Sequence, residues 1–143
     1  QGEHITPAVG RLIEALDLER LEVAKRFGVS VRTVQEHFSR SYPVAPSGVH
    51  EMNREMVRKG IGGFGPKTAQ SRYVLEDVPF GLVVTATLAR IAGIPAPLHE
   101  AGIVTLSAAY GRDFGLENDL LHALNIDGMS MEQLRQFAET GKR

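Results

Sequence analysis

The sequence predicts an all-α fold, a compact multi-helix bundle that takes in the whole chain. Two observations carry this prediction. Apolar residues recur close to every 3.6 residues in several segments, and helix start and stop signals bracket those segments. Thr6-Pro7 is typical of a helix start, and Gly28, Gly93 and Gly111 are typical of helix ends. We find no convincing strand pattern.

Each expected helix has its own local signals, in chain order. The first expected helix covers residues 7–27, the second is capped by Ser30 and runs through Val31, Val34 and Phe38 toward Arg40, and the third follows Pro46-Ser47 with Val49, Met52, Met56 and Val57 on its apolar side. Two further helices are expected from Asp77 to about Ile91 and from Pro97 to Gly111. A short helix around 118–124 is capped by Asp113 and Asp119, and the last begins at Ser130, whose Gln133 completes a capping box. Charged residues between Glu14 and Arg26 share the first helix's polar face.

Composition limits the classes of function. The chain has 143 residues, which fits one domain over 1–143, and its 16 Lys plus Arg against 17 Asp plus Glu give a net charge of −1. This balance provides no positive electrostatic field that would attract nucleic acid. Without cysteine the chain has neither disulfides nor thiolate metal sites, which favours a reducing cytoplasm. No apolar run is long enough for a membrane span. The absence of an initiator Met indicates a fragment of a longer protein.

Two motifs match known binding signatures by spacing. Residues 21–38 fit a helix-turn-helix, with Ala24, Gly28 and Val34 where two helices would meet, so a DNA-binding regulator is one alternative function. Gly60 to Gly65 matches G-x-G-x-x-G, but charged helical sequence precedes it and Pro66 follows it. Because the dinucleotide fingerprint needs a strand before it and a helix after it, we interpret this match as accidental.

A polar cluster precedes the most apolar helix. Arg72, Glu76 and Asp77 stand just before Val78-Pro79, where a carboxylate can cap free backbone N–H groups. One interpretation is a capping Asp77 with an Arg–carboxylate pair that closes the helix end. The other is a carboxylate held at the helix entrance to orient a catalytic group, with Arg72 free to bind an anionic substrate. Spacing alone leaves both open.

Taken together, the segments resemble the α-helical C-terminal domain of the octopine/nopaline (opine) dehydrogenase family. The resemblance spans essentially the whole chain, and its most specific part is Arg72-Tyr73 with Glu76-Asp77-Val78-Pro79-Phe80-Gly81-Leu82-Val83. The other carrying segments are Ile5-Thr6-Pro7-Ala8-Val9, Glu14-Ala15-Leu16-Asp17-Leu18-Glu19-Arg20, Gly65-Pro66, Gly93-Ile94-Pro95-Ala96-Pro97, Gly111-Arg112-Asp113-Phe114 and Gly128-Met129-Ser130.

The resemblance implies an oxidoreductase that reductively condenses an amino acid with a 2-oxo acid, using NAD or NADP in its reduced form. In such enzymes an N-terminal Rossmann domain binds the dinucleotide, and a His from between the domains handles the proton. By motif position, Asp77 resembles the Asp that orients this His, and Arg72 resembles the substrate-binding Arg. His4 does not match the His motif.

We therefore expect a substrate domain without its Rossmann partner, inactive alone and with no cofactor bound by this chain alone. A homodimer is a possible partner. A plain helical interaction or dimerisation module is the remaining alternative, because apolar helices can also serve a partner.

Overall fold

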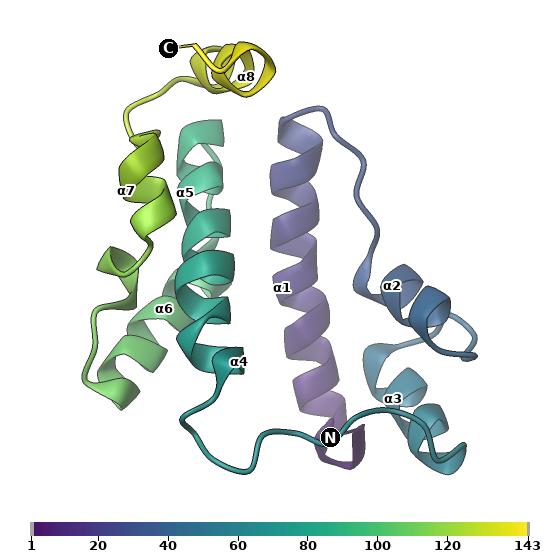
Figure 1. Ribbon diagram of the computed structural model, residues 1–143. Coiled ribbons are helices and arrows are strands. Elements are labelled where there is room, and N and C mark those ends of the chain that lie inside the picture. The colour runs from purple at the N-terminus through teal and green to yellow at the C-terminus, as the bar shows by residue number, and fades with distance from the viewer. Residues whose placement is uncertain (1, 143) are drawn as a thin grey trace.

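A computed structural model describes residues 2–142, and within them it confirms the all-α fold. Figure 1 shows the helices around one long central helix. The helices are α1 (Pro7–Arg26), α2 (Val34–Ser41), α3 (Val49–Arg58), α4 (Arg72–Leu75), α5 (Val83–Ala92), α6 (Pro97–Tyr110), α7 (Asp119–Leu124) and α8 (Met131–Thr140), with short turns η1 (Gly2–His4), η2 (Val78–Leu82) and η3 (Phe114–Leu116) between them.

Helix α1 is the axis of the fold. It begins as predicted, because the Thr6 side chain accepts the Val9 N–H and Pro7 occupies the first turn. It ends at Arg26, with Phe27 as its C-cap, and Gly28 takes a positive φ of 74°. α1 contacts α3 on one side and α5 and α6 on the other, as Figure 1 shows.

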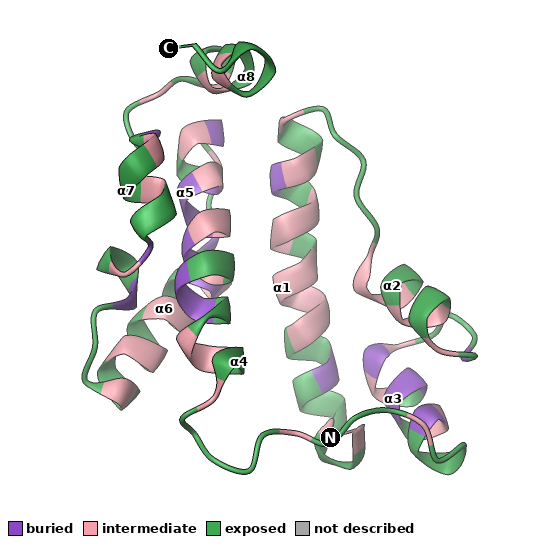
Figure 2. Cartoon of the chain, viewed as in Figure 1, coloured by how far each residue is buried: buried purple, intermediate pink, exposed green. Residues whose placement is uncertain are grey.

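Two small apolar cores flank α1. One joins α1 to α5 and the start of α6 through Val23, Ala89 and Ala96. The other lies between α2 and α3, where Val44, Met52 and Met56 pack under partly buried aromatic side chains. Figure 2 shows buried residues concentrated on α3 and α5, whereas α1 is divided between intermediate and exposed residues. The chain therefore depends on α1 to hold its two sides together.

Three carboxylates of α1 make that connection, and the sequence prediction placed them only on a polar face. Glu14 accepts the Val49 N–H at the start of α3 at 2.7 Å. Asp17 accepts the Val34 N–H at the start of α2 at 2.8 Å. Glu19 accepts two N–H groups at the start of α6. A carboxylate at a helix N-terminus satisfies free amides and meets the positive end of the helix dipole.

The predicted start of α2 was wrong by three residues. Thr33, not Ser30, caps this helix: its hydroxyl accepts the Glu36 N–H, and the Glu36 carboxylate accepts the Thr33 N–H at 2.8 Å. A complete capping box is stronger than a lone serine, because two amides are satisfied reciprocally. Residues 27–33 thus separate α1 from α2, whereas a helix-turn-helix uses a turn of about three to four residues. Residues 21–38 do not form that motif.

The signals near the C-terminus gave one correction and one confirmation. Asn118, not Asp113 or Asp119, caps α7 by accepting the Leu121 N–H at 2.8 Å, and Asp113 instead caps the short turn η3. Asp119 is the first residue of α7. Ser130 caps α8 as predicted, with Gln133 completing the capping box.

The Gly-rich connection follows α3 directly and runs below α1 to α4 in Figure 1. Gly60 and Gly62 take positive φ, and Phe64 is 95% exposed. No strand precedes it in residues 2–142, so the G-x-G-x-x-G match lacks the context of a dinucleotide fingerprint. Across those residues, every helix is either too short or too polar to cross a bilayer.

Candidate active site

The candidate site is the corner where the chain passes from α4 into α5. Arg72 begins the single-turn helix α4, and Glu76 and Asp77 link it to η2. η2 is a π-helical turn, since the Val83 N–H donates to the carbonyl of Val78 five residues earlier. Such turns are rare and often occur at functional sites. The sequence prediction gave one continuous α-helix from Asp77, which the π-helical turn corrects.

Asp77 is exposed and does not cap the helix. It occupies the N-cap position of η2 but makes no side-chain capping hydrogen bond, so the capping interpretation was wrong for this residue. Within residues 2–142 no ion pair or side-chain hydrogen bond to Asp77 is formed. The Pro79 nitrogen carries no hydrogen, which removes one amide that an Asp at this position could otherwise meet. The carboxylate is left facing solvent.

Arg72 lies one helical turn before Glu76, which is the neighbour of Asp77. Arg72 and Glu76 form an exposed ion pair. The Arg72 Nε and a Glu76 carboxylate oxygen are 3.5 Å apart, with the side chains 75% and 59% exposed. Exposed pairs of this kind contribute about 0–1 kcal/mol. Glu76 is therefore a weak competitor for the guanidinium, and the Arg–carboxylate pair predicted at this helix end is formed by Glu76.

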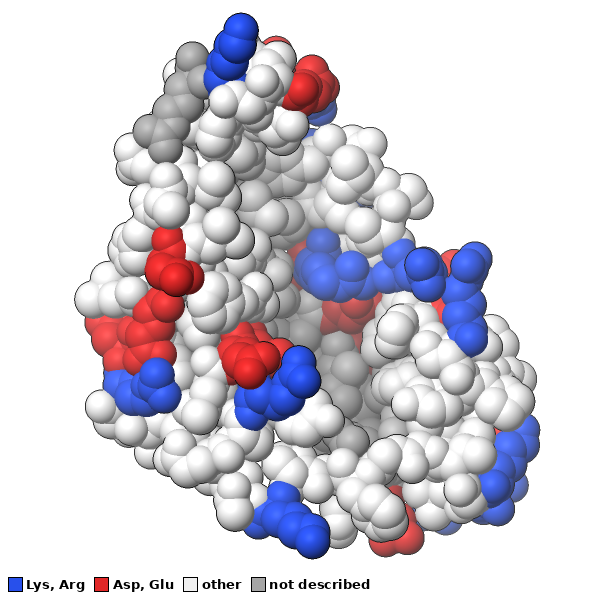
Figure 3. All heavy atoms as spheres, in the orientation of Figure 1, with Lys and Arg blue, Asp and Glu red and all other residues white. Residues whose placement is uncertain are grey.

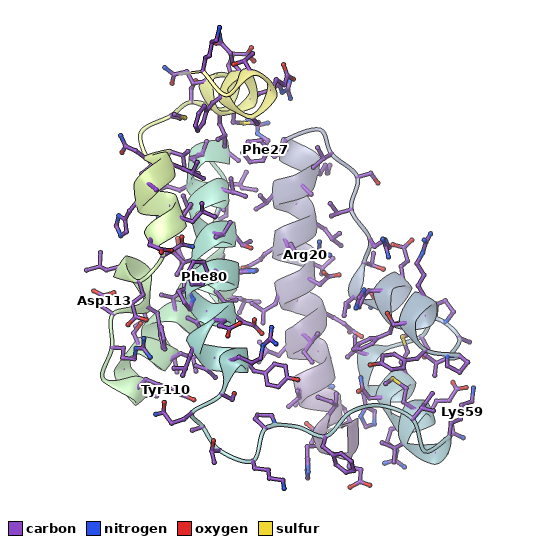
Figure 4. All side chains as sticks on the ribbon, viewed as in Figure 1. Arg20, Phe27, Lys59, Phe80, Tyr110 and Asp113 are labelled. Carbon is purple, nitrogen blue, oxygen red and sulfur yellow. The ribbon has the colours of Figure 1, made fainter. Side chains whose placement is uncertain are left out.

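A hollow of about 440 Å³ adjoins these carboxylates and is lined by Glu76, Asp77, Phe80 and Gly81. Figure 3 shows acidic and basic side chains around the hollowed centre of this face of the molecule; the four residues that line the hollow beside Asp77 all lie between α4 and α5. In Figure 4, Phe80 lies beside α5, whereas Arg20 lies on α1, where its guanidinium donates to Asp17 and to the Arg32 carbonyl. Phe80 is 47% exposed, so an apolar ring borders the carboxylate.

A second cavity, of about 460 Å³, lies elsewhere. It is bordered by α5, α6 and α7 and includes Thr87, Val104 and Asn118. Arg90 and Asp127 form an exposed ion pair at its rim, with 3.6 Å between the charged atoms. Neither Asp77 nor Arg72 lines this cavity. Its size alone does not make it the site of chemistry.

Three of the five histidines have polar partners away from Asp77. His99 is buried, and its Nδ1 lies 2.7 Å from the Glu19 carboxylate. The His50 Nδ1 lies 2.5 Å from the Ile5 carbonyl oxygen, and the His122 Nε2 lies 3.1 Å from that of Leu116. Residues 2–142 contain no cluster of three or more His, Cys, Asp or Glu side chains suited to a metal ion.

One buried residue near the site escaped the sequence prediction. Asn118 is 1% exposed, and its side-chain amide donates to the Pro79 carbonyl oxygen at 2.8 Å. A helix-capping Asn carries an obvious local role, and nothing in the sequence indicates that it also bonds to a turn 39 residues earlier. The contact was therefore not foreseeable from local signals.

Comparisons with known proteins agree on one family. The family model described as NAD/NADP octopine/nopaline dehydrogenase, alpha-helical domain, matches residues 2–110. An opine dehydrogenase of Arthrobacter sp. (strain 1C) is 35% identical over 138 residues, which cover 96% of this chain and 38% of that protein. An opine dehydrogenase of Haliotis discus hannai is 45% identical over 72 residues, covering 50% of this chain and 16% of that protein.

This chain thus spans well under half the length of the two relatives. The matched residues include α4, η2 and α5, which carry Arg72 and Asp77. The family model describes an α-helical domain, and the described fold is all-α. The chain belongs to the octopine/nopaline dehydrogenase family of oxidoreductases and corresponds to its α-helical domain.

Proposed function

We propose that this chain is the substrate-side domain of an enzyme that reductively condenses an amino acid with a 2-oxo acid. The two relatives named opine dehydrogenase support the activity, because one of them aligns with 96% of the chain. NADH or NADPH supplies the hydride, and a Rossmann domain elsewhere in the same protein binds this dinucleotide. The other half of the reaction site then comes from outside residues 1–143.

Asp77 orients the catalytic imidazole in this proposal. Its exposure and its lack of a capping bond are the observations that support the role. A carboxylate that accepts an imidazole N–H fixes the tautomer of the ring and stabilises the imidazolium. The His comes from the part of the protein that precedes Thr6. Asp77 stands at the start of η2, on the helical segment that continues into α5, which suits a group that must keep one orientation.

Arg72 binds a substrate carboxylate. A guanidinium can hold a carboxylate through two parallel hydrogen bonds, and Arg72 is three-quarters exposed. Its weak pairing with Glu76 leaves it able to exchange one carboxylate for another. Phe80 and the hollow beside Asp77 offer an apolar surface for the rest of the substrate.

Replacing Asp77 in the complete enzyme tests the function. Asp77→Asn should lower kcat by about a hundredfold or more, with KM little changed, because the imidazole loses its orienting partner while the cleft stays intact. Asp127→Asn, which alters an exposed carboxylate at the other cavity, serves as the control and should leave kcat near its starting value. A near-normal kcat for Asp77→Asn would contradict the proposed role.

Titration of this chain alone with NADH and NADPH tests which part of the protein binds the dinucleotide. We expect no measurable affinity for either dinucleotide. Clear micromolar binding of either one would overturn the proposal that the dinucleotide is held outside residues 1–143.

A further inference from the structure

The turn that follows Asp77 does not have the hydrogen-bond pattern of an α-helix. In an α-helix the Val83 N–H would donate to the Pro79 carbonyl, four residues earlier. In η2 that N–H donates to the Val78 carbonyl instead. Val78 and Pro79 are buried, with Val78 only 2% exposed. A donor from another segment that reaches this buried carbonyl would therefore stabilise the turn.

Asn118 supplies that donor. Its Nδ2 lies 2.8 Å from the Pro79 carbonyl oxygen, and its Oδ1 accepts the Leu121 N–H at 2.8 Å. The two partners fix the orientation of the amide, because a carbonyl needs the NH₂ side and an N–H needs the oxygen. At 1% exposure, the side chain is closed off from water that could replace either bond.

We propose that Asn118 is a positioning residue for Asp77, an inference that rests on the proposed function. Asn118 ties η2 to the N-terminus of α7 and so stabilises the π-helical geometry of the residues directly after Asp77. On the other side, the Phe80 N–H donates to the Glu76 carbonyl at 2.9 Å, which spans Asp77. The backbone of Asp77 is thereby held from both directions.

The chemistry of this junction requires an amide rather than a general polar group. Asp at position 118 would still accept the Leu121 N–H but would turn a carboxylate oxygen toward the Pro79 carbonyl oxygen. Ser would still cap α7, as Ser is a favoured N-cap, but it is too short to reach Pro79. Both substitutions therefore remove the bond to Pro79 while they retain the cap.

The first experiment measures amide hydrogen exchange and backbone resonances of this chain by NMR. Asn118→Asp and Asn118→Ser should both speed the exchange of the Phe80 and Val83 amides and shift the Asp77 amide resonance. The control is Asn125→Asp, the same change of charge at the exposed C-terminal end of α7. Unchanged η2 amides in Asn118→Ser, the variant without added charge, would overturn the inference.

The second experiment measures kinetics in the complete enzyme. Asn118→Ser should lower kcat roughly ten- to hundredfold with KM within about twofold, since a displaced Asp77 mis-orients the imidazole without removing a substrate contact. A merely structural role would lower the amount of active enzyme and leave kcat per active site unchanged. Altered η2 amides with unchanged kcat would therefore overturn the positioning role.

The two experiments separate this inference from the function on which it rests. If Asp77→Asn keeps a normal kcat while Asn118→Ser disturbs η2, the catalytic role of Asp77 fails. If Asp77→Asn loses activity and Asn118→Ser does not, the positioning role alone fails. Loss in both variants, with Asn125→Asp unaffected, supports both.

Discussion

The Glu19 carboxylate of α1 and the His99 imidazole of α6 meet at 2.7 Å, although 80 residues separate them in the chain. The same carboxylate accepts the Leu98 N–H at 2.8 Å and the His99 N–H at 3.1 Å. α6 has no capping side chain of its own, because its N-cap residue is Ala96. Glu19 is thus both the missing cap of α6 and the partner of its buried histidine.

Glu19→Gln should destabilise the chain by about 1–3 kcal/mol, the typical cost of weakening charged hydrogen bonds around a buried group. The glutamine places an NH₂ group where one of two acceptor oxygens now stands. Urea unfolding followed by circular dichroism measures the free energy of unfolding. Glu22→Gln is the matched control on the same helix, because Glu22 is 55% exposed and, within residues 2–142, pairs only with Lys25 at 3.4 Å.

The control should change the free energy of unfolding by less than about 0.5 kcal/mol, as is usual for surface substitutions. Equal effects of Glu19→Gln and Glu22→Gln would mean that α6 does not depend on a cap from α1. The contact between α1 and α6 would then rest on apolar packing alone.

The same carboxylate predicts an acid-sensitive fold. Burial raises the pKa of Glu19, but hydrogen bonds from the His99 side chain and from the Leu98 and His99 amides outweigh it, and the pKa lies below its ordinary value of 4.5. A carboxyl whose pKa is lower in the folded state adds stability above its unfolded pKa. That contribution should disappear as the pH falls through the folded value.

Urea unfolding from about pH 6 down to about pH 3 measures this dependence. The difference in stability between the unaltered chain and Glu19→Gln should shrink as the pH falls below 4.5. Below that range the protonated carboxyl resembles the glutamine amide. A difference that stays constant over the whole range would contradict a lowered pKa for Glu19.

Most of the helices could be predicted from the sequence because their start and stop signals are local. Thr6, Ser130 and the glycines at 93 and 111 act on their own helices, and the structure confirms them there. The first error, Ser30 for Thr33, arose between two neighbouring cap candidates. Glu36, three residues after Thr33, is the signal that separates them.

The caps from α1 could not be predicted in the same way, because they join segments far apart in the chain. Gly48 and Ala96 carry no side-chain acceptor of their own, and a helix start without a local cap indicates an acceptor from elsewhere in the chain. At the site, Asp77 and Arg72 came from the family resemblance rather than from spacing. The π-helical turn was not predicted, because the helix start and stop signals do not indicate where a rare i→i+5 turn replaces an i→i+4 one.

Glu14 gives a test of capping across helices. Glu14→Ala should lower the free energy of unfolding by about 0.5–2 kcal/mol, because the Val49 N–H loses its acceptor at the start of α3. Gly48→Ser should restore part of this loss, since the new hydroxyl together with Glu51 would form a capping box within α3. A Cβ at position 48 comes too close only to the carboxylate of Glu51, and that flexible end of the side chain can move.

Urea unfolding of the two single variants and of the double variant closes a cycle. The serine should stabilise the Glu14→Ala background more than it stabilises the unaltered chain, where α3 is already capped. The same gain in both backgrounds would show that Glu14 does not act through the start of α3.

Arg72→Ala should raise KM for the acidic substrate by roughly ten- to hundredfold in the complete enzyme, because a charged hydrogen bond contributes about 1.5–3 kcal/mol. Glu76→Gln should have the opposite effect, a slightly lower KM, because it removes the carboxylate that now pairs with Arg72 at 3.5 Å. Arg90→Ala, which removes a similarly exposed arginine paired with Asp127, is the control. Steady-state kinetics with each substrate varied in turn also identifies which substrate carries the recognised carboxylate.

An equal rise in KM for Arg72→Ala and Arg90→Ala would point to a general loss of positive charge. A higher KM for Arg72→Ala but not for Arg90→Ala, together with a lower KM for Glu76→Gln, is expected only if the substrate carboxylate displaces Glu76 from the Arg72 guanidinium.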